Sequence, residues 1–258
     1  MGDIGEFFSF LSQYMRVIRR GFVLRKNPYQ KGRFRINGDR SLLVDYGDDI
    51  DLTTNRKVKR MAEILSGERL KGVQAIIPSY RNISVVYNPL EISVLELRDQ
   101  ILLLEDRFDQ TDASVRRVVE IPVCYGKEFG PDIDFVADYN HIRPDDVILL
   151  HTAPLYTVFA VGFTPGFCYL GGLHKRLHTP RLDNPRLTVP AGSVGIAENQ
   201  TGVYPLETPG GWRLIGRTPL TLFNPDRPDP FLCGIADSIK FVAISVEEFD
   251  QIRQSKAP

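Results

Sequence analysis

The sequence has few of the residues that metal knuckles, disulfide frameworks and membrane spans require. It contains three cysteines among 258 residues, Cys124, Cys168 and Cys233, and no two of them form a Cys-x-x-Cys pair. This spacing argues against a zinc knuckle and a disulfide framework, and it fits a reducing cytoplasm. No apolar run approaches the roughly 20 residues of a membrane-spanning helix, and Asp3 and Glu6 stand where a signal peptide is basic. We therefore expect a cytoplasmic protein.

An excess of charge of one sign is also absent. Lys and Arg total 32 and Asp and Glu total 32, so no overall field attracts nucleic acid or an anionic membrane surface. The chain has neither G-x-x-x-x-G-K-[ST] nor a G-x-G-x-x-G after a strand, so the usual motifs assign no phosphate site. With 43% hydrophobic residues, the chain is expected to fold around a sizeable core, in one large domain or two ordinary ones.

Hydrophobic periodicity predicts a small α+β unit after residue 32. Apolar residues at helical spacing between 58 and 65 predict one helix, and Ser93-Val94-Leu95-Glu96 matches the capping box that opens another. Alternating apolar and polar residues predict four strands, at 34–36, 42–46, 73–77 and 83–87. The expected order is ββαββα.

The chain divides into three predicted segments. Residues 1–32 carry six Lys or Arg against two acids, and we interpret them as an extension, either a basic amphipathic helix or a poorly ordered end. Of the 18 prolines, only Pro28, Pro78 and Pro89 precede residue 117, which predicts a boundary near residues 110–117. We expect a small α+β domain at 33–112 and a second domain at 113–258.

The second domain is predicted to be all-β. Short apolar runs separated by frequent breakers are typical of a barrel or a sandwich. Helical periodicity there is limited to the neighbourhood of Val136 and to residues 247–253. The predicted strands include 118–123, 147–151, 156–163, 214–216, 220–223 and 239–244.

One segment combines glycine, proline and aromatic residues more densely than any other. Residues 161–172 have the sequence VGFTPGFCYLGG. Glycine and proline fix unusual backbone geometry and the aromatic rings offer flat faces, a combination that suits a planar, polar small molecule. The alternative is a barrel corner filled by aromatic side chains. Cys168 has no adjacent base to lower its pKa, so we interpret it as a small buried residue.

Basic side chains follow between residues 179 and 195. Arg181 and Arg186 offer guanidinium forks for a carboxylate or phosphate, although solvated surface arginines are commoner. The sequence from Ala191 to Gly195 superficially resembles a nucleophile elbow around Ser193. No helix is predicted after it, so a serine in a turn is the favoured interpretation.

The histidines give no metal-site pattern. His174 and His178 are four residues apart, but Pro180 leaves little room for the helix that would align them, and no general base lies between them. His151 ends an apolar run, where a strand would open onto a site. A lone histidine is more often structural, yet His151 is the histidine that we would test as a base.

The last cluster lies between residues 200 and 219. Gln200, Tyr204, Trp212 and Arg217 together offer an amide, a hydroxyl, a stacking face and a cation. That set suits recognition of an amide and a carboxylate. The alternative is that Trp212 plugs the end of the barrel.

Three long segments carry a resemblance: GFTPGFCYLGG, PRLDNPRLTVPAGSVGIAENQTGVYP and PGGWRLIGRTP. Together they resemble the Kip-type family, also described as allophanate hydrolase subunit 1, over residues 33–250. The resemblance implies an α+β first domain followed by a cyclophilin-like β-barrel. The basic extension departs from the family, and Glu198-Asn199 stands where a smaller residue such as glycine is expected.

The resemblance implies three functions. Some members act as the B subunit of 5-oxoprolinase, working with a related barrel subunit and a third, lactam-utilisation-type subunit that together open 5-oxoproline to glutamate with ATP hydrolysis. Others form half of the carboxyltransferase region of urea carboxylase, or inhibit a sporulation histidine kinase. We expect the first function, with ATP consumed by the complex and the isolated chain inactive, and keep the other two as alternatives.

The family's motif positions imply the site residues. His151 and Arg217 are the implied catalytic residues, and either Arg181 or Arg217 is expected to hold the substrate carboxylate. The implied substrate-binding residues are Phe163, Pro165, Gly166, Tyr169, Arg181, Gly192, Ser193, Gln200, Tyr204 and Trp212.

Overall fold

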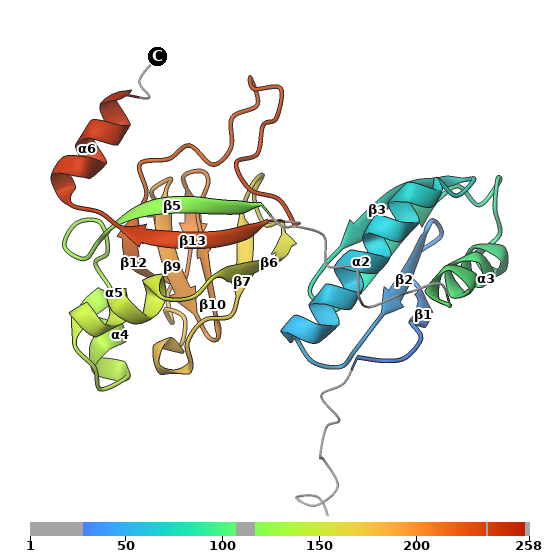
Figure 1. Cartoon of the computed structure of the whole chain (residues 1–258), viewed down its shortest axis with the longest axis horizontal. Coiled ribbons are helices and arrows are strands. Elements are labelled where there is room, and N and C mark those ends of the chain that lie inside the picture. Colours follow the sequence, from blue (N-terminus) through green and yellow to red (C-terminus); the bar gives the residue numbers. More distant parts are fainter. Residues whose placement is uncertain (1–27, 107–116, 236, 256–258) are drawn as a thin grey trace, which may run out of the picture.

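The computed structural model describes residues 28–106, 117–235 and 237–255. It places an N-terminal α+β domain beside a β-barrel, with α2 of the first domain next to β6 and β7 of the second (Figure 1). Residues 1–27 of the predicted extension and the predicted boundary at 112/113 lie outside the described residues.

The N-terminal domain has the predicted ββαββα order, which confirms the sequence analysis. Its elements are β1 (Arg33–Ile36), β2 (Ser41–Asp45), α2 (Leu52–Glu68), β3 (Val73–Pro78), β4 (Asn82–Tyr87) and α3 (Val94–Glu105). The strands form an antiparallel sheet in the order β1-β2-β4-β3. The Asp51 side chain accepts from the first backbone amides of α2, and the predicted Ser93–Glu96 capping box opens α3.

The second domain is a closed barrel, as predicted. Its strands are β5 (Val118–Tyr125), β6 (Tyr156–Val161), β7 (Cys168–Gly171), β9 (Ser193–Ala197), β10 (Gln200–Val203), β12 (Arg213–Arg217) and β13 (Ser238–Ala243). They close in the order β10-β7-β6-β13-β5-β12-β9, with β13 parallel to β5. Strands β8 (Arg186–Val189) and β11 (Thr208–Gly210) form a separate two-stranded sheet.

Helices complete the second domain. They are α4 (Ile133–Tyr139), α5 (Pro144–Thr152), the short 3₁₀ helix η1 (Lys175–Leu177) and α6 (Val246–Ser255). The helical periodicity near Val136 and at 247–253 is therefore confirmed. Within the described residues, no helix is long and apolar enough to span a bilayer.

Two predicted strands are wrong. Residues 147–151 lie in α5, which begins with Pro144 at its first turn and carries Asp145 and Asp146 near its N-terminus. These are helix-start features, and in this helix Val147 is buried while Leu149 is 66% exposed. Residues 220–223 form no strand, because the one bridge that they make with another described segment joins Phe223 to Phe231.

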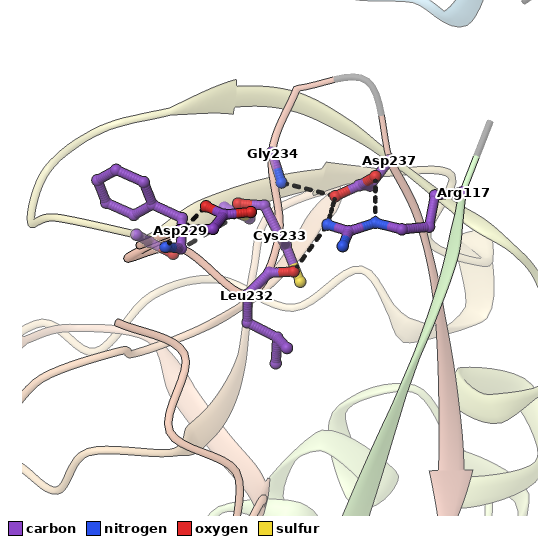
Figure 2. A network of polar contacts seen from close by, with 9 residues as sticks. Arg117, Asp229, Leu232, Cys233, Gly234 and Asp237 are labelled. Atoms are coloured by element: carbon purple, nitrogen blue, oxygen red, sulfur yellow. Dashed lines mark hydrogen bonds and ion pairs between the residues drawn. The ribbon is translucent and has the colours of Figure 1, made fainter. Parts of the chain in front are cut away.

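An ion pair joins the starts of β5 and β13 at one end of the barrel, which we call the barrel entrance. Arg117, just before β5, donates from Nε to Asp237 Oδ1 at 3.0 Å and from Nη2 to Asp237 Oδ2 at 2.6 Å (Figure 2). Its Nη2 also reaches the Leu232 carbonyl at 3.0 Å, and the Gly234 amide donates to Asp237 at 2.9 Å. The contacts hold the starts of the parallel strands β5 and β13 together.

A buried asparagine joins the two domains. Asn55, on α2, is 0% exposed, and its Nδ2 donates to the Tyr80 carbonyl at 2.9 Å and to the Phe159 carbonyl at 3.1 Å. Phe159 belongs to β6, and its ring also meets the Tyr80 ring edge-on at 6.1 Å. Asn55 therefore fixes the turn between β3 and β4 against the barrel.

Candidate functional site

Aromatic side chains gather on the outer face of the barrel, over β7 and β10. The Phe167 ring lies 4.7 Å from that of Tyr169, 5.2 Å from that of Tyr204 and 5.4 Å from that of Trp212, all edge to face. This is the geometry that aromatic quadrupoles prefer. These four residues, which we call the aromatic cluster, form a small core separate from the barrel interior.

Small residues allow the aromatic cluster to lie against the strands. A Cβ atom at Gly202 of β10 would come within 3.1 Å of both the Phe167 and Trp212 rings, and within 2.9 Å of the Cys168 carbonyl. The turn before β7 bends through Gly166 at φ +82°, and its Phe163 also has a positive φ, 71°. Phe163 is 61% exposed and extends the cluster toward solvent, 5.7 Å from Phe167.

The N-terminal domain contributes Tyr80, which the sequence analysis missed. The Tyr80 ring lies 5.7 Å from that of Tyr169, and the Gln200 side chain approaches its hydroxyl. Burial raises the pKa of Tyr80 to about 12, so this phenol is a neutral donor at ordinary pH. Gln200 Nε2 is buried and has no partner with hydrogen-bond geometry in the described part of the chain.

Arg181 supplies positive charge beside these hydroxyls. The preceding carbonyl, of Pro180, accepts from Arg213 Nε at 3.2 Å, and the following amide, of Leu182, donates to the Gly211 carbonyl at 2.8 Å. The backbone is thus anchored on both sides while the side chain is exposed. Burial raises the pKa of Tyr169 and Tyr204, and the Arg181 charge opposes that rise in both.

A strained turn holds Arg181 near Gln200. Glu198 connects β9 to β10 with φ +54°, in the left-handed region where glycine is favoured; the expectation of a smaller residue there has this physical basis. Its amide donates to the Thr179 carbonyl at 2.8 Å, and the Thr179 amide donates back at 3.2 Å. This pair of hydrogen bonds holds residues 179–181 beside the start of β10.

The cluster and its polar neighbours suit one kind of ligand. The exposed Phe163 ring and the half-buried Tyr169 ring can stack on a planar group, whereas Phe167, Tyr204 and Trp212 are at most 5% exposed and pack beneath them. Gln200 and Tyr80 offer hydrogen bonds to an amide, and the Arg181 fork matches a carboxylate. Among the described residues no group of His, Cys, Asp and Glu is arranged to hold a metal ion. The arrangement is thus one of neutral donors, aromatic faces and a cation.

Other predicted residues lie away from the cluster. Ser193 pairs with Arg217, the last residue of β12. Trp212 precedes the first residue of β12, so about 16 Å of strand separates Trp212 from Arg217. Gly192 precedes Ser193, and a Cβ there would come within 2.4 Å of the Thr218 carbonyl. Pro165 is exposed in the turn before β7. Arg186 pairs with Asp132 at 2.8 Å, which occupies the guanidinium.

His151 is not part of this surface. It is 0% exposed on α5, Tyr125 Oη lies 2.8 Å from its Nδ1, and Thr201 Oγ1 lies 2.9 Å from its Nε2. Burial lowers its pKa to about 3. The expectation that His151 ends a strand and opens onto a site is wrong, because the apolar run before it is a helix packed against the barrel interior.

Residues 32–233 match the family described as carboxyltransferase domain, subdomain C and D. The chain belongs to this family.

Two curated relatives match almost their whole length. The B subunit of 5-oxoprolinase from Bacillus subtilis (strain 168) is 38% identical over 231 residues, covering 84% of this chain and 95% of that protein. The B subunit of 5-oxoprolinase from Escherichia coli O157:H7 is 41% identical over 216 residues, covering 83% and 96%. The similarity of this carboxyltransferase-family chain to these subunits therefore extends over most of its length.

A solved structure shows the same fold. The Kluyveromyces lactis urea carboxylase aligns with a TM-score of 0.72 at 21% identity, over 90% of this chain and 24% of that one. At this identity the likeness concerns the family fold, an α+β domain followed by a barrel.

Proposed function

We propose that this chain is the B subunit of an ATP-dependent 5-oxoprolinase. The observation that carries the proposal is the 38% and 41% identity to two such subunits over 95% and 96% of their lengths. The reaction converts 5-oxoproline, ATP and water to glutamate, ADP and phosphate. Two partner subunits, a related barrel subunit and a lactam-utilisation-type subunit, complete the enzyme, and ATP consumption belongs to the complex.

The aromatic cluster is the proposed place for the lactam. 5-Oxoproline has a planar amide in a five-membered ring and one carboxylate. The half-buried Tyr169 ring offers a face to the flat lactam, and the buried Trp212 ring packs against it at 5.9 Å. Gln200 and Tyr80 are the proposed donors to the lactam carbonyl. Arg181, exposed beside them, is the proposed partner of the carboxylate. The chain alone is expected to be inactive, because small-ligand sites often lie at the boundary between protein units and the partner subunits are proposed to complete this one.

The test is 5-oxoproline-dependent ADP release by the three co-purified subunits, with each subunit omitted in turn. We expect turnover only from the complete complex. An assembled complex that releases no ADP with 5-oxoproline contradicts the proposal.

Carboxyl transfer is the second candidate, because the family is described as a carboxyltransferase domain. In that case the same surface accepts a carboxyl group from carboxybiotin on another chain. The assembled complex incubated with a carboxybiotin donor and urea distinguishes the two functions: carboxylated urea supports transfer, and glutamate formed from 5-oxoproline without biotin supports lactam opening.

A further inference from the structure

A second concave site lies on the side of the barrel away from the N-terminal domain. It is a pocket of about 190 Å³ between the end of β12, the turn before β9 and helix α6. Figure 1 shows α6 at the end of the barrel opposite the N-terminal domain. The residues that matter for its chemistry are Arg217, Thr218, Leu220, Phe249 and Arg253.

Two guanidinium groups line this pocket. Arg217 is half-buried, and its Nε donates to the Ala191 carbonyl at 2.8 Å, which fixes the plane of the fork. Across the described ranges, neither its Nη atoms nor the Arg253 side chain has a hydrogen-bond or ion-pair partner. Up to four guanidinium N–H groups of Arg217 and the whole fork of Arg253 are therefore available to a ligand.

The pocket has an excess of positive charge. Burial and the neighbouring Arg253 lower the pKa of Arg217, and Glu207 opposes that effect only in part. Two like charges in one half-enclosed site repel each other, and an anion between them removes the repulsion. The site is therefore electrostatically suited to an anion.

The other half of the pocket is apolar. Phe249, which is 4% exposed, and Leu220 line it together with Pro205 and Pro219. An inorganic ion makes no use of such a wall, whereas the carbon skeleton of an organic acid does. The volume is below the roughly 300–1,000 Å³ of pockets for drug-sized ligands, so a whole nucleotide does not fit.

We propose that the pocket between Arg217 and Arg253 binds a small organic carboxylate, with its carboxyl group between the two guanidiniums and its carbon atoms against Leu220 and Phe249. This site goes beyond the proposed function and is separate from the aromatic cluster. Arg217 thus belongs to a carboxylate site of its own, away from Arg181.

The experiment is calorimetric titration of the full chain, and of the three-subunit complex, at low salt with butyrate, 5-oxoproline, L-glutamate and inorganic phosphate. We expect saturable binding of at least one carboxylate. Arg253→Gln and Arg217→Gln should each weaken it by at least about tenfold, since a charge-assisted contact is lost. Arg227→Gln, an exposed arginine outside the pocket, is the matched control and should leave the affinity unchanged.

Several results overturn the proposal. Binding of phosphate with none of the carboxylates assigns the pocket to an inorganic anion. Carboxylate binding that Arg181→Gln abolishes and Arg253→Gln leaves intact belongs to the aromatic cluster. Absence of carboxylate binding to both the chain and the complex rejects the site, and because titration is independent of turnover, that result leaves the 5-oxoprolinase proposal to its own test.

Discussion

Two neighbouring residues of β10 face opposite sides of the barrel wall and have opposite surroundings. Thr201 points into the interior, where its hydroxyl donates to the Gly195 carbonyl at 2.9 Å and lies 2.9 Å from His151 Nε2. Gln200 points outward, and its Nε2 has no hydrogen-bond partner among the described residues. Successive strand residues alternate faces, so one strand carries both a completed polar network and an incomplete one.

The hydrogen bonds inside the barrel determine which atom donates and which accepts at each contact of His151. Because the single Thr201 proton goes to Gly195, the hydroxyl accepts from His151 Nε2, and Nδ1 is left to accept from Tyr125 Oη. A neutral imidazole satisfies both contacts. Polar groups that are completed inside a fold stabilise it, whereas a buried donor without a partner, such as Gln200 Nε2, is left for a ligand that reaches it. This difference makes the two sides of β10 separately testable.

The largest expected effect is on the interior side. His151→Leu leaves the Tyr125 and Thr201 hydroxyls without their shared partner, which should lower the free energy of unfolding by about 2–4 kcal/mol. Urea unfolding followed by the fluorescence of Trp212, the one tryptophan, measures this. Turnover per folded complex should stay within about twofold of wild type. If the variant folds but its turnover falls far below wild type, His151 takes part in the reaction, and the interior side of β10 is not purely structural.

The exterior side should show the reverse pattern. Arg181→Gln removes an exposed cation that has no ion pair in the described part of the chain, so the free energy of unfolding should change by less than about 0.5 kcal/mol. The kcat/KM for 5-oxoproline should fall about 10–100-fold, the loss expected for a charge-assisted contact to a carboxylate. Arg227→Gln is the matched control. Unchanged kinetics with Arg181→Gln would remove this arginine from the proposed site.

Sequence alone predicted the N-terminal domain well because its order is encoded locally. Strand alternation, helical spacing and the Ser93–Glu96 capping box each act within a few residues. The apolar run at 147–150 was misassigned because a short apolar run fits a buried strand and a helix equally well. The Pro144-Asp145-Asp146 sequence at the start of α5 is the local signal that distinguishes this helix from a strand.

The candidate site was predictable only in part. Tyr169, Gln200, Tyr204 and Trp212 stand in dense local motifs, and the structure brings them together. Tyr80 lies in another domain, and its approach to Tyr169 depends on the Asn55 contacts, which no local pattern encodes. For the same reason, Arg217 and Arg253 meet only through the packing of α6, so no local motif indicates that they share a pocket.

Acid should destabilise the fold through the His151 network. The pKa of His151 is about 3 in the folded chain and about 6.5 when unfolded. The unfolded state therefore binds more protons between these values, and stability falls as pH drops below about 6.5, by up to about 1.4 kcal/mol per pH unit. Urea unfolding at pH 7, 6 and 5 measures the slope. His151→Leu should flatten it, and an equal slope in the variant would assign the acid sensitivity to other groups.

The smallest expected effect on stability comes from the ion pair at the barrel entrance, between Arg117 and Asp237. Burial acts to raise the pKa of Asp237, but hydrogen bonds from Arg117 and the Gly234 amide lower it below its usual value. Asp237 therefore stabilises the fold above its unfolded pKa of about 3.9, and this contribution is lost only as pH falls below that value. Arg117→Ala should cost about 1 kcal/mol at pH 7, because the arginine is largely solvated.

This effect begins only below about pH 3.9 and overlaps just the lower end of the His151 range, which extends from about 6.5 to about 3. The two can therefore be resolved in one titration. Arg117→Ala should leave the slope between pH 5 and 6.5 intact and reduce the further loss of stability near pH 3–4. A change in the upper range on removal of Arg117 would mean that the entrance and the His151 network unfold as one coupled unit. In that case the inside of the barrel could not be treated separately from its entrance.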